Sequence, residues 1–430
     1  MFKNKYFHLQ RLMGNERRSQ DELINIQTTK LRRLITHAYE NVKFYRDIFQ
    51  GIGLHPEDIK SVDDIHKIPI IDKNDFHQRP SSDLLDKRIK DKDRLVPINT
   101  SGSSGLSLRF YIDYDYDQFR KAQYLRPYLT NGRRPWDKVF RLSNTDVPKK
   151  KWFQRLSLLA EYNIYPDSNL EHQINLINKL KPTIIQGFGS CLALLASKIV
   201  QENISITAPR VVFTGSELLT KQIRTTIARG FNAEVVDVYG TFETDNVAYE
   251  CSKHEGYHIT SDCVIMEFLK DGEKINAGEE GEIVCTVLDN FTMPFIRYNL
   301  HDLGSYADKQ CSCERTFPLM DIIGGRSDDY AVYGNGLTKS PRNFLGLFDP
   351  LAKFLYEYQV IQEDIYKFTV QVVPNKNYDR KIERTIRENL QKEFPEAQID
   401  IKVFDKIERE QSGKFRAFIS KVKNKTVIDK

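Results

Sequence analysis

The 430-residue sequence predicts an α/β protein with a parallel sheet, a small antiparallel subdomain and a small C-terminal α+β unit. Between residues 168 and 238, short apolar runs alternate with amphipathic segments, the pattern of parallel strands joined by helices. Residues 257–300 change to the alternation of an antiparallel sheet. A chain of this length exceeds the usual size of a single core. We therefore expect two domains, residues 1–327 and 328–430.

The first predicted helix covers residues 19–50, because Ser19 and Glu22 have the spacing of a capping box and apolar residues recur on one side. Three later helices are predicted. The first is capped by Ser168 and Glu171, the second spans about residues 190–203, and the third runs from Thr220 to Gly230. The strands between them are expected near residues 184–185, 210–213 and 234–238. After the polar linker 324–329, strands near residues 358–362, 367–373, 399–404 and 415–422 accompany a helix near 378–393.

Composition narrows the function classes. The 64 Lys and Arg residues exceed the 59 Asp and Glu residues by only five, which argues against a nucleic-acid partner or an anionic membrane. No run approaches the roughly 18 apolar residues of a membrane span, and the N-terminus has no apolar signal region. We expect a soluble, cytoplasmic protein. Its six cysteines are then candidates for metal binding rather than for a disulfide framework.

A short Ser/Gly-rich segment is predicted to bind phosphate. Glycine permits positive φ, and hydroxyl groups and free backbone N–H groups can donate to phosphoryl oxygens. No Gly-Lys-Ser/Thr sequence follows it, so it is not a Walker loop. The segment consists of Thr100, Ser101, Gly102, Ser103, Ser104 and Gly105.

Two further polar motifs follow predicted strands, where ligands bind in parallel sheets. The first contains Gly215, Ser216 and Glu217. The second contains Tyr239, Gly240, Thr241, Phe242 and Glu243. Packing alone does not explain polar residues at both of these positions.

In order along the chain, these motifs resemble those of the adenylate-forming ligases, and among them the phenylacetate–CoA ligase and CapK-like group. The resemblance covers nearly the whole chain and includes the segments 34–46, 297–304, 325–329 and 412–416. It implies a large N-terminal adenylation domain, a mobile C-terminal lid, and activation of a small-molecule carboxylate by ATP and Mg²⁺.

The resemblance also implies a role for each motif. The Ser/Gly segment would hold the leaving phosphates, and residues 215–217 would contact adenine. Thr241 would contact the α-phosphate, and Glu243 would bind Mg²⁺, which prefers oxygen ligands. Asp302 would bind the ribose with support from Arg326, Asp328 would be the hinge, and Lys414 would supply positive charge to the reacting carboxylate and α-phosphate.

A second constellation predicts a structural zinc site. Cys311 and Cys313 form a Cys-x-Cys pair that, with Cys251 and one histidine, can complete a tetrahedral set of ligands. His254 and His258 compete for the fourth position, and we favour His258 because it lies in an alternating, strand-like stretch. Relatives in the family carry a similar set. Cys191, Cys263 and Cys285 are expected in the core.

Departures from the family pattern leave the acyl acceptor open. Leu106 and Ser107 follow the Ser/Gly segment where relatives have Lys or Pro, and residues 332–341 replace a stretch that lies near the thiol acceptor in relatives. CoA is the expected acceptor. The alternatives are transfer to a sugar or amine in capsule-type polysaccharide biosynthesis, and a zinc-stabilised binding protein without catalysis. The resemblance also leaves a homodimer open.

Overall fold

The computed structural model describes most of the chain. The described residues are 5–100, 108–143, 160–166, 168–326, 331–334, 338–339, 346–351, 354–409 and 415–422. They divide into two compact units, which we call unit 1 (residues 1–133 and 236–322) and unit 2 (residues 134–235 and 323–430). The predicted domain boundary between residues 327 and 328 lies outside the described residues.

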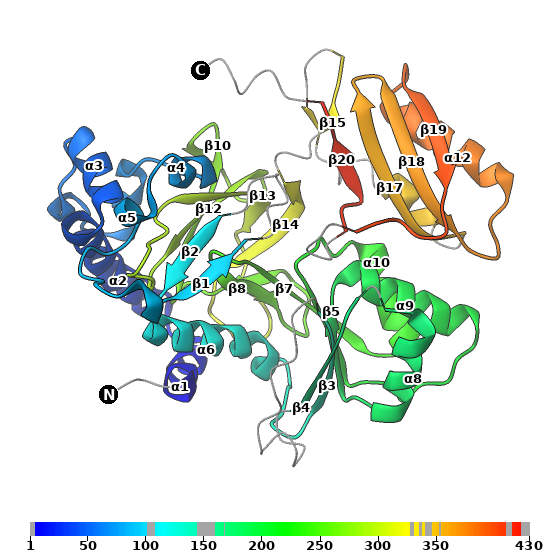
Figure 1. The fold of residues 1–430 in the computed structure, drawn as a ribbon, viewed down its shortest axis with the longest axis horizontal. Helices are drawn as coiled ribbons and strands as arrows, with labels where there is room; N and C mark the ends of the chain where they lie inside the picture. Colours follow the sequence, from blue (N-terminus) through cyan, green and yellow to red (C-terminus); the bar gives the residue numbers. More distant parts are fainter. Residues whose placement is uncertain are drawn as a thin grey trace. The chain divides into compact units, whose positions relative to one another are not determined.

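Unit 1 combines an N-terminal group of helices with a mainly antiparallel sheet (Figure 1). Its helices are α1 (Lys5–Asn15), α2 (Gln20–Asn41), α3 (Lys43–Gly51), α4 (Lys73–His77), α5 (Ser81–Leu84) and α6 (Tyr114–Thr130), with short 3₁₀ turns at Pro56–Asp58, Val62–Lys67 and Lys92–Arg94. Strands β1 (Val96–Asn99) and β2 (Arg109–Ile112) form a separate antiparallel hairpin.

The larger sheet of unit 1 has the strand order β11-β10-β12-β13-β14-β9-β8-β7. Its strands are β7 (Glu234–Thr241), β8 (Asp245–Glu250), β9 (Tyr257–Ile259), β10 (Val264–Lys270), β11 (Glu273–Lys274), β12 (Gly281–Val287), β13 (Tyr298–Ala307) and β14 (Leu319–Arg326). The predicted antiparallel subdomain is confirmed by the β10–β12 and β12–β13 pairings. Ile283, Cys285 and Val287 lie in the core of this unit, and Val284 and Thr286 between them are also buried.

One prediction for the N-terminal helices needs correction. The expected helix 19–50 is two helices, because Val42 adopts an extended conformation (φ −116°, ψ 110°) that ends α2 and starts α3. The bend lets Phe44 and Phe49 of α3 pack into the core. The capping box of Ser19 and Glu22 is confirmed.

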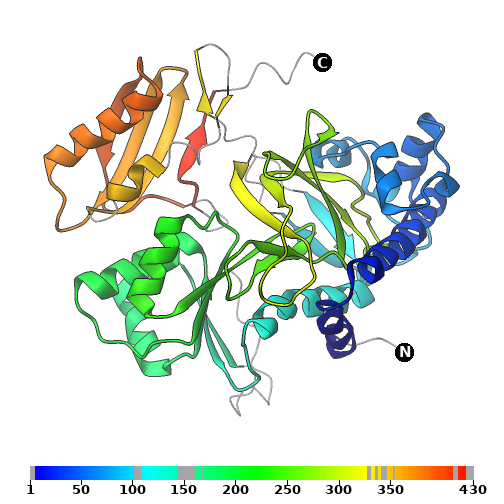
Figure 2. The ribbon, with the colours of Figure 1, turned by 180° about the vertical axis from the view of Figure 1, so that it is seen from behind.

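Unit 2 begins with a parallel sheet of order β6-β5-β3-β4, as predicted. Its strands are β3 (Lys138–Leu142), β4 (Ala160–Ile164), β5 (Ile184–Gly187) and β6 (Val211–Gly215), and its helices are α8 (Leu170–Leu180), α9 (Gly189–Gln201) and α10 (Lys221–Phe231). The three helices lie together on one side of the strands and share an apolar core with them (Figures 1 and 2). Helix α8 is capped by Asn169, whose side chain accepts from two backbone N–H groups, and not by Ser168, whose hydroxyl donates to the carbonyl of Tyr165.

The C-terminal part of unit 2 is the predicted α+β unit. Its elements are β15 (Ala331–Val332), β16 (Thr338–Lys339), a 3₁₀ turn at Gly346–Leu351, β17 (Leu355–Asp364), β18 (Lys367–Pro374), α12 (Arg380–Glu393), β19 (Gln398–Val403) and β20 (Phe418–Ser420). Four strands form a sheet of order β19-β18-β17-β20, and Ile382, Ile386 and Leu390 of α12 pack against it. The α/β class, with a mixed sheet and a small C-terminal domain, is thus confirmed.

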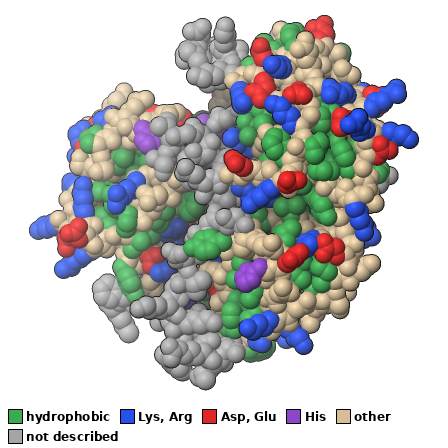
Figure 3. Space-filling view, turned by 45° about the vertical axis from the view of Figure 1, so that its right-hand side comes forward, with side chains coloured by type: hydrophobic (Ala, Val, Ile, Leu, Met, Phe, Trp, Pro, Cys, Tyr) green, Lys and Arg blue, Asp and Glu red, His purple; other side chains and the backbone are tan. Residues whose placement is uncertain are grey.

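Charged side chains of both signs are intermixed on the face shown in Figure 3. This agrees with the small net charge of +5. In the part of the chain that the structure describes, none of the helices combines the length and apolar character that crossing a membrane requires.

Candidate functional site

Thr100 closes the base of the β1–β2 hairpin. Its backbone N–H donates to the carbonyl of Leu108 at 2.9 Å, and its hydroxyl oxygen accepts from the N–H of Leu108 at 2.9 Å. Thr100 and Leu108 are therefore paired across the base of the hairpin that contains the Ser/Gly segment. The other predicted phosphate-binding residues of the segment, Ser101–Gly105, lie outside the described residues.

The hairpin between β7 and β8 carries Tyr239–Glu243. Gly240 is required at its position, because a Cβ atom there would lie 1.9 Å from the carbonyl oxygen of Asp245. Asp245 itself has a φ of +59°, so the turn reverses sharply through a left-handed residue. The close backbone contact at Gly240 and the positive φ of Asp245 together restrict the turn to one backbone conformation.

A buried ion pair holds this turn on helix α6. The guanidinium of Arg120 donates to both carboxylate oxygens of Asp245, with an Nη2–Oδ1 distance of 2.6 Å. Both side chains are largely buried, at 16% and 11% exposed. Burial raises the pKa of Asp245, and Arg120 opposes that increase. The pair anchors the hairpin two residues after Glu243.

Thr241 and Glu243 lie in this anchored turn. The backbone N–H of Thr241 donates to the hydroxyl of Thr244 at 3.3 Å, and the two hydroxyl oxygens are 3.1 Å apart. Glu243 has no hydrogen-bond or ion-pair partner among the described residues, and its side chain is half-buried. Its carboxylate therefore has no competing cation among the described residues, and its role as a Mg²⁺ ligand stays a prediction.

Asp302 and Tyr239 lie together although they come from different strands. The hydroxyl of Tyr239 on β7 donates to Oδ2 of Asp302 on β13 at 2.8 Å. Two predicted nucleotide-binding residues, 63 positions apart, thus share one hydrogen bond. The contact fixes the direction of the Asp302 carboxylate.

The turn with Gly215, Ser216 and Glu217 belongs to unit 2 and follows β6. Ser216 is exposed and has a φ of +67°, whereas the Glu217 carboxylate faces the protein. Oε2 of Glu217 accepts from the N–H of Ser190 at 2.9 Å, and Oε1 accepts from the N–H of Phe415 at 2.7 Å. Burial raises the pKa of Glu217, and the two backbone donors oppose the increase.

Three other predicted site residues have no described side chain. Arg326 ends strand β14, and its side chain is outside the described set. Asp328, the predicted hinge, and Lys414, the predicted catalytic lysine, also lie outside the described residues.

Cys251, His258, Cys311 and Cys313 come together in unit 1, with their candidate ligand atoms all within 4.8 Å of one another. The Sγ atoms of Cys251 and Cys311 are 3.5 Å apart, and Sγ of Cys313 lies 3.3 Å from Nε2 of His258. Burial lowers the pKa of His258 to about 4, which keeps its imidazole neutral at neutral pH. His254 instead faces Glu250, with Nδ1 3.5 Å from its carboxylate.

Three cysteine sulfurs and one histidine nitrogen are a ligand set that fits Zn²⁺. Tetrahedral zinc with bonds of about 2.3 Å to sulfur and 2.0 Å to nitrogen places two sulfurs about 3.8 Å apart, and a sulfur and a nitrogen about 3.5 Å apart. The distances in the cluster are close to these values. Cys191, Cys263 and Cys285 are buried outside the cluster, as expected.

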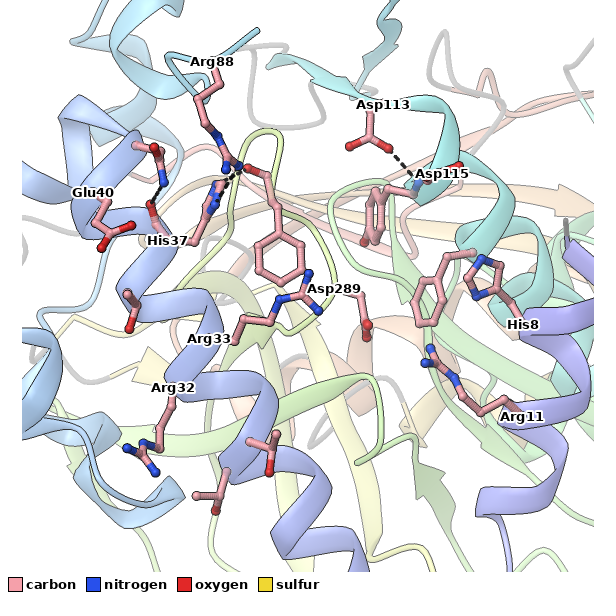
Figure 4. A pocket seen from close by; sticks show the side chains of 17 residues that line it. His8, Arg11, Arg32, Arg33, His37, Glu40, Arg88, Asp113, Asp115 and Asp289 are labelled. Atoms are coloured by element: carbon pink, nitrogen blue, oxygen red, sulfur yellow. Dashed lines mark hydrogen bonds between the residues drawn. The ribbon is translucent and has the colours of Figure 1, made fainter. Parts of the chain in front are cut away.

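A pocket of about 820 Å³ lies between α1, α2 and α6 (Figure 4). Arginine and acidic side chains both line it, among them Arg11, Arg33, Asp115 and Asp289. None of the predicted site residues lines this pocket, so the candidate site is elsewhere in the molecule.

Sequence reasoning missed the residues that hold the site. Arg120 and Asp245 are 125 positions apart, and no pattern in the sequence pairs them. Arg409 and Glu357 in unit 2 form a second buried ion pair, with an Nη2–Oε1 distance of 2.6 Å. The only available signal was the place of Asp245, two residues after the Tyr239–Glu243 motif.

Comparison with known proteins adds to this geometry. Residues 335–421 match a family model described as the CapK C-terminal domain. The chain is 30% identical to the phenylacetate-coenzyme A ligase of Escherichia coli (strain K12), over 74% of each chain. It is 25% identical to Protein CapK of Staphylococcus aureus, over 98% of this chain and 93% of that protein.

A solved structure has the same fold. It is a 2-hydroxyisobutyryl-CoA ligase in the postadenylation state, in complex with R3-HIB-AMP. The TM-score is 0.79 at 17% identity, covering 96% of this chain and 92% of that one. With the E. coli relative and the ordered motifs of the site, these findings show that the chain belongs to the phenylacetate–CoA ligase family of AMP-forming acid–thiol ligases.

Proposed function

We propose that this protein activates a small-molecule carboxylate with ATP to form an acyl-adenylate, and then transfers the acyl group to CoA. The observation that supports this most directly is the anchored β7–β8 turn, which presents Thr241 and the Glu243 carboxylate, for which the described part of the chain supplies no partner. Family membership supports the two-step reaction.

Each residue of the site has a distinct task in the first step. The carboxylate of the substrate attacks the α-phosphate and pyrophosphate leaves, so negative charge must be held at several oxygens at once. The Thr241 hydroxyl would donate to the α-phosphate, and the Asp302 carboxylate, oriented by Tyr239, would accept from the ribose hydroxyls. Lys414 would bring a positive charge to the reacting oxygens.

The residues present fit a magnesium ion. Glu243 is an oxygen donor without a competing cation among the described residues, and Mg²⁺ takes one or two carboxylates together with substrate phosphates. Bound Mg²⁺ would neutralise phosphate charge during pyrophosphate departure. The Cys251, His258, Cys311 and Cys313 cluster would hold a structural zinc, since four protein ligands leave no open position for water.

The test is carboxylate-dependent exchange of labelled pyrophosphate into ATP, measured over a panel of aliphatic, aromatic and hydroxy acids. We expect at least one acid to support exchange and Glu243→Gln to reduce it strongly. If no acid supports exchange with folded, metal-replete protein, the chain is better explained as a binding protein.

A second candidate is transfer of the acyl group to a sugar or an amine. The CapK relative spans nearly the whole chain, and the CapK C-terminal family model covers residues 335–421, which include most of the segment that departs from the CoA ligase pattern. The acid selected by pyrophosphate exchange would be offered with CoA, amino sugars and amino acids. A thioester product supports the first candidate, and an amide or ester product supports the second.

A further inference from the structure

Arg409 lies at the centre of a buried network in unit 2. Its Nη2 donates to Oε1 of Glu357 on β17 at 2.6 Å, and its Nη1 donates to the hydroxyl of Ser190 in the first turn of α9 at 2.7 Å. Its guanidinium carbon also lies 5.1 Å from the centre of the Phe415 ring. The side chains of Arg409 and Glu357 are only 9% and 7% exposed.

Glu217 completes the network from the other side. It accepts the backbone N–H of Ser190 and that of Phe415, so one carboxylate joins the start of α9 to the chain after residue 414. Arg409 and Phe415 are the described residues that border the segment 410–414. Both ends of the segment that contains Lys414 are therefore held on the β6 and α9 end of unit 2.

Stability alone does not account for this arrangement. Replacing a buried ion pair by apolar residues of similar volume is often neutral or stabilising, because desolvation offsets the attraction. Here burial raises the pKa of Glu357 to about 7, and it also raises that of Glu217. The buried groups instead fix the positions of Arg409 and Phe415, since each of these residues makes a hydrogen bond to the β6 and α9 end of unit 2.

We propose that Glu217, Ser190 and Arg409 are positioning residues for adenylation, because they fix Arg409 and Phe415, the described residues on either side of the segment that contains Lys414. The proposal rests on the function proposed above, which assigns Lys414 to that step. Only two of these hydrogen bonds join the C-terminal α+β unit to β6 and α9, namely Arg409 to Ser190 and Phe415 to Glu217. If the lid rotates for acyl transfer, as the proposed two-step function requires, both bonds would break and transfer would not depend on them.

The test uses Ser190→Ala, which removes one hydroxyl acceptor, and Glu217→Gln, which keeps the side-chain volume but changes one acceptor into a donor. Lys376→Ala is the matched control, because Lys376 also contacts the α9 end, donating to the carbonyl of Gln201 at 2.9 Å on the exposed surface. Each full-length variant is assayed for pyrophosphate exchange with the best acid of the panel, and for acyl transfer from pre-formed adenylate.

We expect exchange to fall by about tenfold or more in Ser190→Ala and Glu217→Gln, since displacing a catalytic group by about 1 Å can cost a hundredfold. Transfer should change by less than about threefold, and Lys376→Ala should match the wild type in both. Hydrogen exchange at the Phe415 amide should accelerate in Glu217→Gln, because its acceptor is altered.

The outcomes separate the two proposals. If the wild-type protein exchanges pyrophosphate and both variants do so at the same rate, the positioning role is overturned. Equal losses in exchange and transfer also overturn it, because a general structural defect would affect both steps. A wild-type protein that is inactive with every acid overturns the proposed function itself, and with it the role assigned to the network.

Discussion

Loss of the predicted zinc site should destabilise the protein much more than it alters the chemistry. The perturbation is Cys311→Ser, which removes a sulfur that lies 3.5 Å from that of Cys251. The four candidate ligand atoms lie within 4.8 Å of one another, and three of the four residues are buried, so water cannot readily replace the lost ligand.

The magnitude follows from the kind of site. Losing a structural metal is among the few single changes that cost more than about 4 kcal/mol. For a unit of about 150–250 residues, 1 kcal/mol shifts Tm by roughly 2–4 °C. We therefore expect Cys311→Ser to lower Tm by about 8–16 °C and to reduce the zinc content well below one ion per chain.

The assay pairs elemental analysis with thermal unfolding, on protein purified without chelator. Cys285→Ser is the matched control, because Cys285 is a buried thiol in the same unit outside the cluster. It should keep full zinc content and show a smaller Tm shift. Absence of zinc from the wild type, or equal Tm shifts in the two variants, would refute the reasoning.

Three other variants test the remaining expectations. Lys414→Ala should reduce pyrophosphate exchange by about a hundredfold or more at an unchanged melting temperature; near-normal exchange would remove Lys414 from the mechanism. Asp328→Pro fixes φ at the predicted hinge, so exchange and transfer from pre-formed adenylate should diverge by about tenfold, and equal losses in a folded protein would argue against rotation there. Asp262→Asn should lower the free energy of unfolding, measured with denaturant, by about 3–5 kcal/mol. The reason is that Arg126 is fully buried and bonded to Asp262 at 2.9 Å, and would lose its counter-charge. A decrease below about 1 kcal/mol would contradict this.

Much of the fold is local in origin and was readable from the sequence. The capping box at Ser19, the helix that begins at Thr220 and the alternation of apolar strands with amphipathic helices depend on residues within a few positions of each other. The order of the motifs likewise allowed the family to be recognised. The predicted ends of the helices were less accurate. The expected first helix is interrupted at Val42, and this bend buries Phe44 and Phe49, aromatic residues that follow Val42.

The sequence by itself determined the residue types of the site: a carboxylate at Glu243, another at Asp302, and a set of sulfur and nitrogen donors. Only the tertiary structure decided how they are held. The bonds from Tyr239 to Asp302 and from Arg120 to Asp245 join residues 63 and 125 positions apart. Such pairs leave no periodic pattern, because burial and distance arise only when separate elements pack together. The sequence also favoured His258 over His254, but only the fold brings His258 together with the three cysteines, with the ligand atoms within 4.8 Å of one another.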